Sequence, residues 1–330
     1  MSTGRSFHLF TSLRYDPLLL SSEENSLPIL NFQSPSPFYM LVYHRDRMLE
    51  AAQHFDFHAV AKKLEDGLSL HQELLQKVRE YVQQGGKDEP LKMRILFDKA
   101  ANMTIDFSPV PPLPLSTLYP SSFDPPKPKP TSAPTDHTPS TFQPSPLTGG
   151  ALTLGPTDSL PSKLAEPSPP PEYMLRLDTE PTPTSAFTML KTTVREHYDA
   201  SRARALPANP AGALYAEVLL YNSTHELTEG TLTTIYLFRG GRWVTPPVGV
   251  PAGEFTAETL KELKDVPYSA TLDEGELRKP FAGRWGHSVR SAKVGAGGQR
   301  GTSRRWALKK GFCMEEPISV STVEVGEGVW

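Results

Sequence analysis

Proline is concentrated in one long segment of this chain. Of the 34 prolines, 21 lie between Pro109 and Pro183, and Ser and Thr fill most of the gaps between them. Proline donates no backbone hydrogen bond, so such a segment cannot build a core and is expected to be extended and mobile. Pro-rich segments can also bind SH3-type modules, which leaves a docking role open. The sequence therefore predicts two folded regions, residues 1–108 and 172–330, joined by a Pro-rich disordered linker at 109–171.

The composition excludes several classes of protein. The chain has 330 residues, of which 38% are hydrophobic and 22% charged, as is typical of a soluble globular protein. Its net charge of −3 and the absence of a basic segment argue against nucleic-acid binding. The longest apolar runs, such as YAEVLLY at 215–221, are too short to span a membrane. A single cysteine, Cys313, excludes an intramolecular disulfide, and no signal peptide is evident, so we expect a cytoplasmic protein.

The first folded region has the pattern of a small α/β domain. FYMLVY at 38–43 predicts a strand, and the apolar spacing of 44–55 predicts a helix after it. A second amphipathic helix is expected over 68–82, where Leu and Val recur on one face. Residues 92–98 and 103–110 alternate and flank the turn KAAN, so they predict a hairpin.

The second folded region mixes helices with a strand meander. We expect one helix over 188–205 and another over 301–312, the latter stopped by Gly311. Alternation and turn residues predict four strands, at 213–222, 228–239, 241–247 and 317–325.

Four places in the sequence carry residues with useful chemistry, although each has an ordinary structural explanation. Lys191 is an exposed lysine or, if burial lowers its pKa, an amine able to form an imine. Thr302 and Ser303 cap a helix or hold a phosphate at its N-terminus. Arg47 is a solvated helix arginine or a bidentate phosphate ligand, and Glu229 is a turn acid or the partner of a pyridinium nitrogen. Together they are the parts of a pyridoxal phosphate site.

Six stretches resemble one enzyme family, and they occur in the order that the family shows. The sequence resembles the class IV aminotransferases, which are fold-type IV pyridoxal phosphate enzymes, and within them it is similar to fungal aminodeoxychorismate lyase-like proteins. The matching stretches are FTSLRYDP (10–17), FYMLVYHRDRML (38–49), MLKTTVREHYDASRARA (189–205), AEVLLYNSTHELTEGTLTTIYLF (216–238), WVTPP (243–247) and GGQRGTSRRWALKKG (297–311).

The resemblance implies a role for each cofactor residue. Lys191 matches the lysine that carries pyridoxal 5'-phosphate, at the start of the family's K-x-x-x-R stretch. Glu229 matches the acid that bonds the pyridine N–H. Arg47 matches the phosphate-binding arginine of H-x-x-R-[LM], and Thr302 and Ser303 match the phosphate-binding turn G-[IT]-T-R.

The resemblance also implies a fold and a reaction. Thr11, Ser12 and Arg14 match a first-strand motif that faces the active site, and we expect them on the substrate side. The implied fold is α/β (α+β), with a small N-terminal α/β sandwich and a larger C-terminal barrel-like α/β domain, in a homodimer. The implied reaction converts 4-amino-4-deoxychorismate to p-aminobenzoate and pyruvate, a step of folate biosynthesis. A branched-chain or D-amino-acid transaminase, an inactive family member and a non-enzymatic scaffold built around the proline tract remain alternatives.

The chain departs from the family pattern in several places. Val194 and Thr234 stand where the family has asparagine. Residues from about 250 to 296 form an expected insertion between TPP and GGQRG, and the C-terminus is expected to be truncated, because relatives continue beyond GEGVW. No metal is expected, since the nine histidines show no ligand spacing.

Overall fold

The computed structural model describes most of the two regions predicted to fold. The described residues are 6–126, 173–206, 215–248 and 297–330. All of them belong to one compact unit. The predicted insertion at 250–296 and residues 127–171 of the predicted linker lie outside the described residues, so the predicted division into domains remains a prediction.

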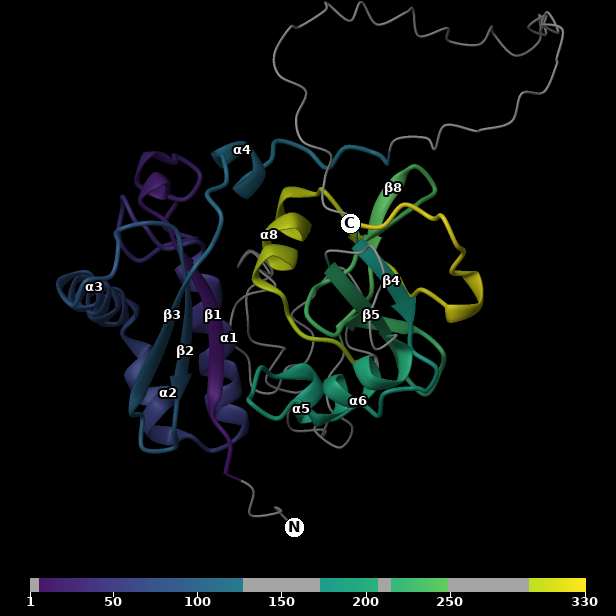
Figure 1. Ribbon diagram of the computed structural model, residues 1–330, viewed down its shortest axis with the longest axis horizontal. Coiled ribbons are helices and arrows are strands. Elements are labelled where there is room, and N and C mark those ends of the chain that lie inside the picture. The colour runs from purple at the N-terminus through teal and green to yellow at the C-terminus, as the bar shows by residue number, and fades with distance from the viewer. Residues whose placement is uncertain (1–5, 127–172, 207–214, 249–296) are drawn as a thin grey trace, which may run out of the picture. The chain divides into compact units, whose positions relative to one another are not determined.

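The N-terminal region contains an antiparallel sheet with helices packed beside it (Figure 1). The strands are β1 (Leu9–Tyr15), β2 (Leu91–Phe97) and β3 (Met103–Pro109), and the helices are α1 (Leu41–His54), α2 (His58–Glu65) and α3 (Gly67–Gln83). Strands β2 and β3 confirm the predicted hairpin, and α3 confirms the second predicted helix. Alternate residues of β1 and β2 are buried with the apolar faces of the helices in one core, because a strand presents successive side chains to opposite faces.

The predicted strand at 38–43 is wrong. Helix α1 already begins at Leu41, and Met40 before it has a left-handed backbone with φ of 54°. Phe38 makes only an isolated bridge to Tyr15. Phe38, Met40 and Leu41 are all fully buried, so the apolar run reflects burial around a turn and a helix start. A short apolar run does not by itself distinguish these cases.

The C-terminal region contains two further three-stranded sheets, in agreement with a mixed α/β class. Strand β5 (Tyr215–Tyr221) pairs in parallel with β4 (Tyr173–Leu177) and antiparallel with β6 (Leu227–Gly230). The other sheet is made of β7 (Leu237–Arg239), β8 (Arg242–Thr245) and β9 (Met314–Glu315). The helices are α5 (Ala186–Met189), α6 (Glu196–Ala205) and α8 (Thr302–Lys310). The barrel-like form of this region remains a prediction.

Three predicted elements of this region differ in the structure. The predicted helix over 188–205 is two helices, α5 and α6, with Lys191 between them. The predicted strand over 228–239 stops at Gly230 and resumes at Leu237, since a turn held by other side chains interrupts it. The predicted strand over 317–325 contains a 3-10 helix, η2 (Val320–Thr322), in place of a ladder. Helix α8 is confirmed, and Gly311 ends it with a left-handed φ of 73°.

The first residues of the predicted linker pack against the rest of the unit. They include a short helix, α4 (Leu115–Leu118), and the hydroxyl of Tyr119 donates to Asn25 Oδ1 at 2.6 Å. The indole nitrogen of Trp243 donates to the carbonyls of Phe123 and Asp124 at 3.3 and 3.2 Å. Residues 109–126 are therefore not a free linker, because buried contacts hold their backbone.

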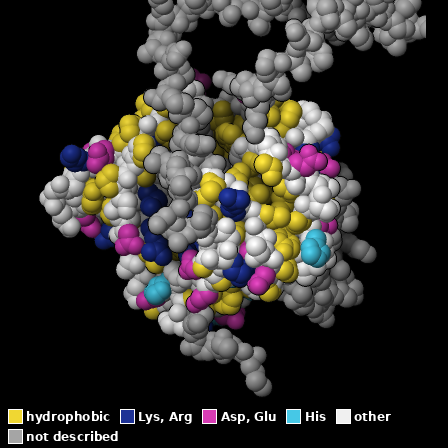
Figure 2. Space-filling view, turned by 45° about the vertical axis from the view of Figure 1, so that its right-hand side comes forward, with side chains coloured by type: hydrophobic (Ala, Val, Ile, Leu, Met, Phe, Trp, Pro, Cys, Tyr) yellow, Lys and Arg dark blue, Asp and Glu magenta, His cyan; other side chains and the backbone are white. Residues whose placement is uncertain are grey.

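On the face drawn in Figure 2, acidic and basic side chains are interspersed over the described residues. Among the described helices, none combines the length and the hydropathy that crossing a membrane requires.

Candidate active site

Lys191 lies on the short segment between α5 and α6, beside strand β1. Its carbonyl accepts a hydrogen bond from Phe10 N at 3.3 Å, and the next residue, Thr192, forms an isolated bridge with Leu9. Helix α5 begins with a capping box at Ser185 and ends at Met189, two residues before the lysine. The ammonium nitrogen of Lys191 lies 5.0 Å from the centre of the Phe10 ring. Strand β1 and α5 together therefore fix the lysine backbone.

The environment of Lys191 favours its neutral amine. Burial, together with the nearby charge of Arg47, lowers the pKa of Lys191 from 10.5 to about 7, and the charge of Glu229 opposes part of this shift. Burial disfavours the ammonium ion because the side chain loses hydration of its charge. A lysine with this pKa is partly neutral at physiological pH and can act as a nucleophile or a base.

Glu229 lies near the end of β6, and its charge acts on Lys191 to raise the pKa of the lysine. One carboxylate oxygen accepts a hydrogen bond from the Tyr198 hydroxyl at 2.7 Å, and the other accepts from Gln299 N at 3.0 Å. Burial raises the pKa of Glu229 to about 7, although both hydrogen bonds and the charge of Lys191 oppose this shift. A cationic group placed beside Glu229 would favour its ionised form.

Arg47 of α1 reaches the same site from the N-terminal region. Its guanidinium donates to Thr11 Oγ1 at 2.7 Å and to the Arg300 carbonyl at 3.3 Å. Thr11 Oγ1 also lies 2.7 Å from Nδ1 of His44. Burial lowers the pKa of Arg47 to about 10, so the guanidinium still carries its charge at neutral pH. Its Nε is buried and has no partner among the described residues, which leaves a donor for an anion.

The N-terminus of α8 begins directly beside Arg47. Thr302 and Ser303 are the first two helical residues, and Arg300, whose carbonyl binds Arg47, precedes them by two positions. Thr302 is half-buried and Ser303 is exposed. A side chain at Gly301 would meet Thr234 Oγ1 at 2.4 Å, so glycine lets the turn pass close to that threonine. First-turn amides of a helix and an arginine suit a phosphate group.

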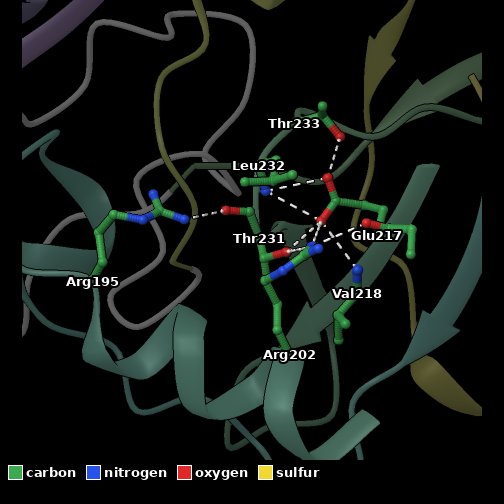
Figure 3. A network of polar contacts seen from close by, with 8 residues as sticks. Arg195, Arg202, Glu217, Val218, Thr231, Leu232 and Thr233 are labelled. Atoms are coloured by element: carbon green, nitrogen blue, oxygen red, sulfur yellow. Dashed lines mark hydrogen bonds and ion pairs between the residues drawn. The ribbon is translucent and has the colours of Figure 1, made fainter. Parts of the chain in front are cut away.

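A buried carboxylate, Glu217 of β5, holds the turn that follows Glu229 (Figure 3). It accepts hydrogen bonds from Val218 N at 3.1 Å, Leu232 N at 3.2 Å, Thr233 Oγ1 at 3.1 Å and the Thr231 hydroxyl. Arg202 lies 3.8 Å from the carboxylate, and Arg195 donates to the Thr231 carbonyl at 3.1 Å. Glu217 thereby interrupts the strand predicted over 228–239 and orients the backbone just beyond Glu229.

The three predicted substrate-side residues lie on both faces of β1. Thr11 is buried and bonded to Arg47, so it belongs to the arginine side of the site. Ser12 is exposed, and Arg14 is bonded to Asp16 at 2.7 Å and to the Pro111 carbonyl at 3.0 Å. By alternation, Ser12 and Arg14 share the face of Phe10, whose ring lies near Lys191. A substrate role for these three residues remains a prediction.

A small cavity adjoins Glu229. Its volume is about 10 Å³, and it is lined by Thr182, Thr184, Thr188, Leu220, Thr228, Glu229, Gly297 and Gly298. The hydroxyl of Thr182 is buried without a partner among the described residues. A cavity of this size admits about one water molecule and no larger ligand.

Three residues that shape the site were not predicted from the sequence. Tyr198 and Gln299 bind Glu229, and Glu217 holds the turn beyond it. Tyr198 lies on the same motif as Lys191, so its position could have been noticed. Gln299 and Glu217 also lie in stretches that match the family, at 297–311 and 216–238, but residue type and spacing alone do not mark them as site residues. Among the described residues, no group of three or more His, Cys, Asp or Glu is arranged to hold a metal ion.

Comparison with known proteins gives no match to a family model and none to a curated protein. Several solved structures are similar. A presumed amino-acid aminotransferase from Mesorhizobium loti is 15% identical with a TM-score of 0.41, over 96% of this chain and 88% of that one. A hypothetical aminotransferase from Mycobacterium tuberculosis is 11% identical with a TM-score of 0.44, over 100% and 82%. The 4-amino-4-deoxychorismate lyase from Pseudomonas aeruginosa is 13% identical with a TM-score of 0.39, over 97% and 79%. Likeness at this level assigns no activity to this chain.

Proposed function

We propose that this chain is a pyridoxal 5'-phosphate enzyme of the class IV aminotransferase family, with Lys191 as the residue that bonds the cofactor. The main observation behind the proposal is that Lys191 and Glu229 both form a hydrogen bond with the same residue, Gln299. The Lys191 amine donates to Gln299 Oε1 at 3.4 Å, and Glu229 accepts from the backbone of Gln299 at 3.0 Å. A neutral amine and a half-buried acid on either side of one residue suit a pyridine ring that carries an aldehyde and a ring nitrogen.

The phosphate end of the cofactor has fitting donors as well. Arg47 is charged, buried and left with an unpartnered Nε among the described residues. Its bond to the Arg300 carbonyl places it beside the start of α8, where Thr302 and Ser303 add first-turn amides and hydroxyls. Such donors bind a phosphate dianion through charge-assisted hydrogen bonds. The residues present therefore fit the cofactor at both ends.

When bound, pyridoxal phosphate supplies an electron sink for bonds at the carbon that carries the substrate's amine. The chain's own residues would do the rest. Glu229 would hold the proton of the ring nitrogen, since its carboxylate accepts hydrogen bonds and favours a neighbouring cation. Lys191, with a pKa of about 7, would move a proton as a general base once its amine is free.

The reaction we favour is that of an aminodeoxychorismate lyase, which converts 4-amino-4-deoxychorismate to p-aminobenzoate and pyruvate for folate biosynthesis. This choice depends on the sequence resemblance, through the RYDP and YHRDRM stretches. A branched-chain or D-amino-acid transaminase would use the same cofactor residues, and an inactive member would bind cofactor without turnover. We propose a small-molecule substrate, a homodimer and a cytoplasmic location.

The test of the cofactor assignment is chemical. The purified chain should turn yellow with pyridoxal phosphate, and borohydride should fix the cofactor on the tryptic peptide that contains Lys191. Lys191→Ala should abolish fixation, whereas the exposed Lys62→Ala should leave it intact. Fixation at another lysine, or none in the folded wild type, would refute the assignment.

The test of the reaction compares substrates on the same loaded protein. Formation of p-aminobenzoate from 4-amino-4-deoxychorismate would support the lyase. Conversion of branched-chain or D-amino acids with a 2-oxo acid, and no p-aminobenzoate, would support the transaminase instead.

A further inference from the structure

A chain of hydrogen bonds connects Lys191 to Glu229 through two uncharged side chains. The Lys191 amine donates to Gln299 Oε1 at 3.4 Å, and Gln299 Nε2 donates to the Tyr198 hydroxyl at 2.8 Å. Tyr198 in turn donates to Glu229 Oε1 at 2.7 Å. Every donor in this chain therefore faces toward the carboxylate.

The carboxylate sets the orientation of the Gln299 amide. A hydroxyl has one proton, and Tyr198 uses it to donate a hydrogen bond to Glu229. The Tyr198 oxygen can therefore only accept the hydrogen bond from Gln299. The amide must then present Nε2 to Tyr198 and Oε1 to Lys191. The orientation of the oxygen that Lys191 contacts is therefore set by Glu229, through the hydroxyl of Tyr198.

Both ends of the glutamine are held in place by the fold. Tyr198 is 2% exposed and packs with Val218 and Leu220, where α6 covers β5. On the other side, Gly297 and Gly298 have left-handed φ values of 81° and 85°. A Cβ at Gly298 would lie 3.0 Å from the Thr228 carbonyl, so only glycine lets this backbone run so close to the residue before Glu229.

We propose that Gln299 is a positioning residue, which orients the Lys191 amine toward the site and keeps it from forming an ion pair with Glu229. The inference depends on the proposed function, because the orientation of the amine matters only if Lys191 bonds the cofactor. A direct ion pair would occupy both groups, whereas a neutral amide between them leaves the amine and the carboxylate available to opposite ends of a ring. The charged groups that act on Lys191 besides Glu229 are Arg47 and Arg195, and both lower its pKa.

The experiment measures how the reactivity of the Lys191 amine depends on pH in the cofactor-free protein. The full chain is pulsed with acetic anhydride over a range of pH, and peptide mass spectrometry gives the modified fraction at Lys191. Wild type should show an inflection at about pH 7. Gln299→Met keeps the length but removes the acceptor, so the inflection should fall by about one to two units, as expected for one hydrogen bond to a charged group. Gln299→Glu adds a negative charge, so the inflection should rise.

The matched control is Gln72→Met on the exposed face of α3, which should leave the Lys191 profile unchanged. A second variant tests whether the hydrogen bonds from Lys191 to Glu229 act together. In a Tyr198→Phe background the effect of Gln299→Met should shrink, because the two residues act through one another. Circular dichroism checks that each variant is folded, and Gln299→Asn, which is too short to span both partners, replaces Gln299→Met if that variant fails to fold.

Two outcomes would overturn the proposal. One is a Lys191 profile in Gln299→Met and Gln299→Glu that matches the control. The other is a shift of both variants in the same direction, which indicates disturbed packing rather than a lost acceptor. Borohydride fixation after adding pyridoxal phosphate separates this proposal from the assigned function: normal fixation with an unchanged profile refutes the positioning role alone, and no fixation in wild type refutes the function.

Discussion

Replacing Glu217 with glutamine should destabilise the protein strongly, although the change is nearly isosteric. The carboxylate is 4% exposed and accepts hydrogen bonds from four donors, which are Val218 N, Leu232 N and the hydroxyls of Thr231 and Thr233. Arg202 lies 3.8 Å away. Glutamine removes the charge and turns an N–H group toward donors that already point inward.

The magnitude follows from the number of bonds. A hydrogen bond to a charged group contributes about 1 kcal/mol more than a neutral one, and four such bonds share one carboxylate, so their losses do not add fully. A mismatched donor at Leu232 N adds the cost of an unsatisfied buried group, about 1–3 kcal/mol. We expect Glu217→Gln to lower the free energy of unfolding by about 2–4 kcal/mol.

The assay is urea unfolding followed by tryptophan fluorescence and circular dichroism. The matched control is Glu180→Gln, which also removes a carboxylate near an arginine, Arg204 at 3.5 Å, but from a side chain that is 65% exposed. The control should change the free energy of unfolding by less than about 1 kcal/mol. A loss for Glu217→Gln no greater than that of the control would show that the turn at 231–233 does not depend on this charge.

Three further predictions concern the cofactor residues. Glu229→Gln should lower turnover by about 10²–10³ without loss of bound cofactor, as measured by steady-state kinetics and absorbance, if the acid stabilises charge in the transition state by about 3–4 kcal/mol. Lys191→Met should stabilise the cofactor-free protein, because the folded pKa of about 7 lies below the ordinary value of 10.5. The buried lysine lowers the free energy of unfolding by its full amount below pH 7, and by less and less as the pH rises toward 10.5. Unfolding curves across that range should show that the stabilisation by Lys191→Met declines with rising pH. Arg47→Lys should weaken binding of pyridoxal phosphate about tenfold or more, since an ammonium cannot replace a bidentate guanidinium, and equilibrium dialysis with unchanged affinity would contradict a phosphate role.

Local patterns in the sequence were enough for the elements whose side chains follow a regular period. Alternation across 92–98 and 103–110 predicted the hairpin of β2 and β3, and helical spacing predicted α3, because each pattern belongs to one kind of backbone. The end of α8 at Gly311 followed from the freedom of glycine to adopt a positive φ. The same reasoning failed at 38–43, where apolar residues are buried around a helix start and not in a strand.

Motifs in the sequence by themselves named Lys191, Glu229 and Arg47 as candidates, because residue type and flanking turns limit the chemistry that each can perform. Only the tertiary structure decided their environment. Gln299 bonds to Lys191 across 108 residues of chain, and Tyr198 reaches Glu229 across 31. No local pattern encodes such pairs, since they form when α6 packs on β5 and the turn before α8 passes Thr228. The lowered pKa of Lys191 and the raised pKa of Glu229 arise from burial, which exists only after the distant segments have come together.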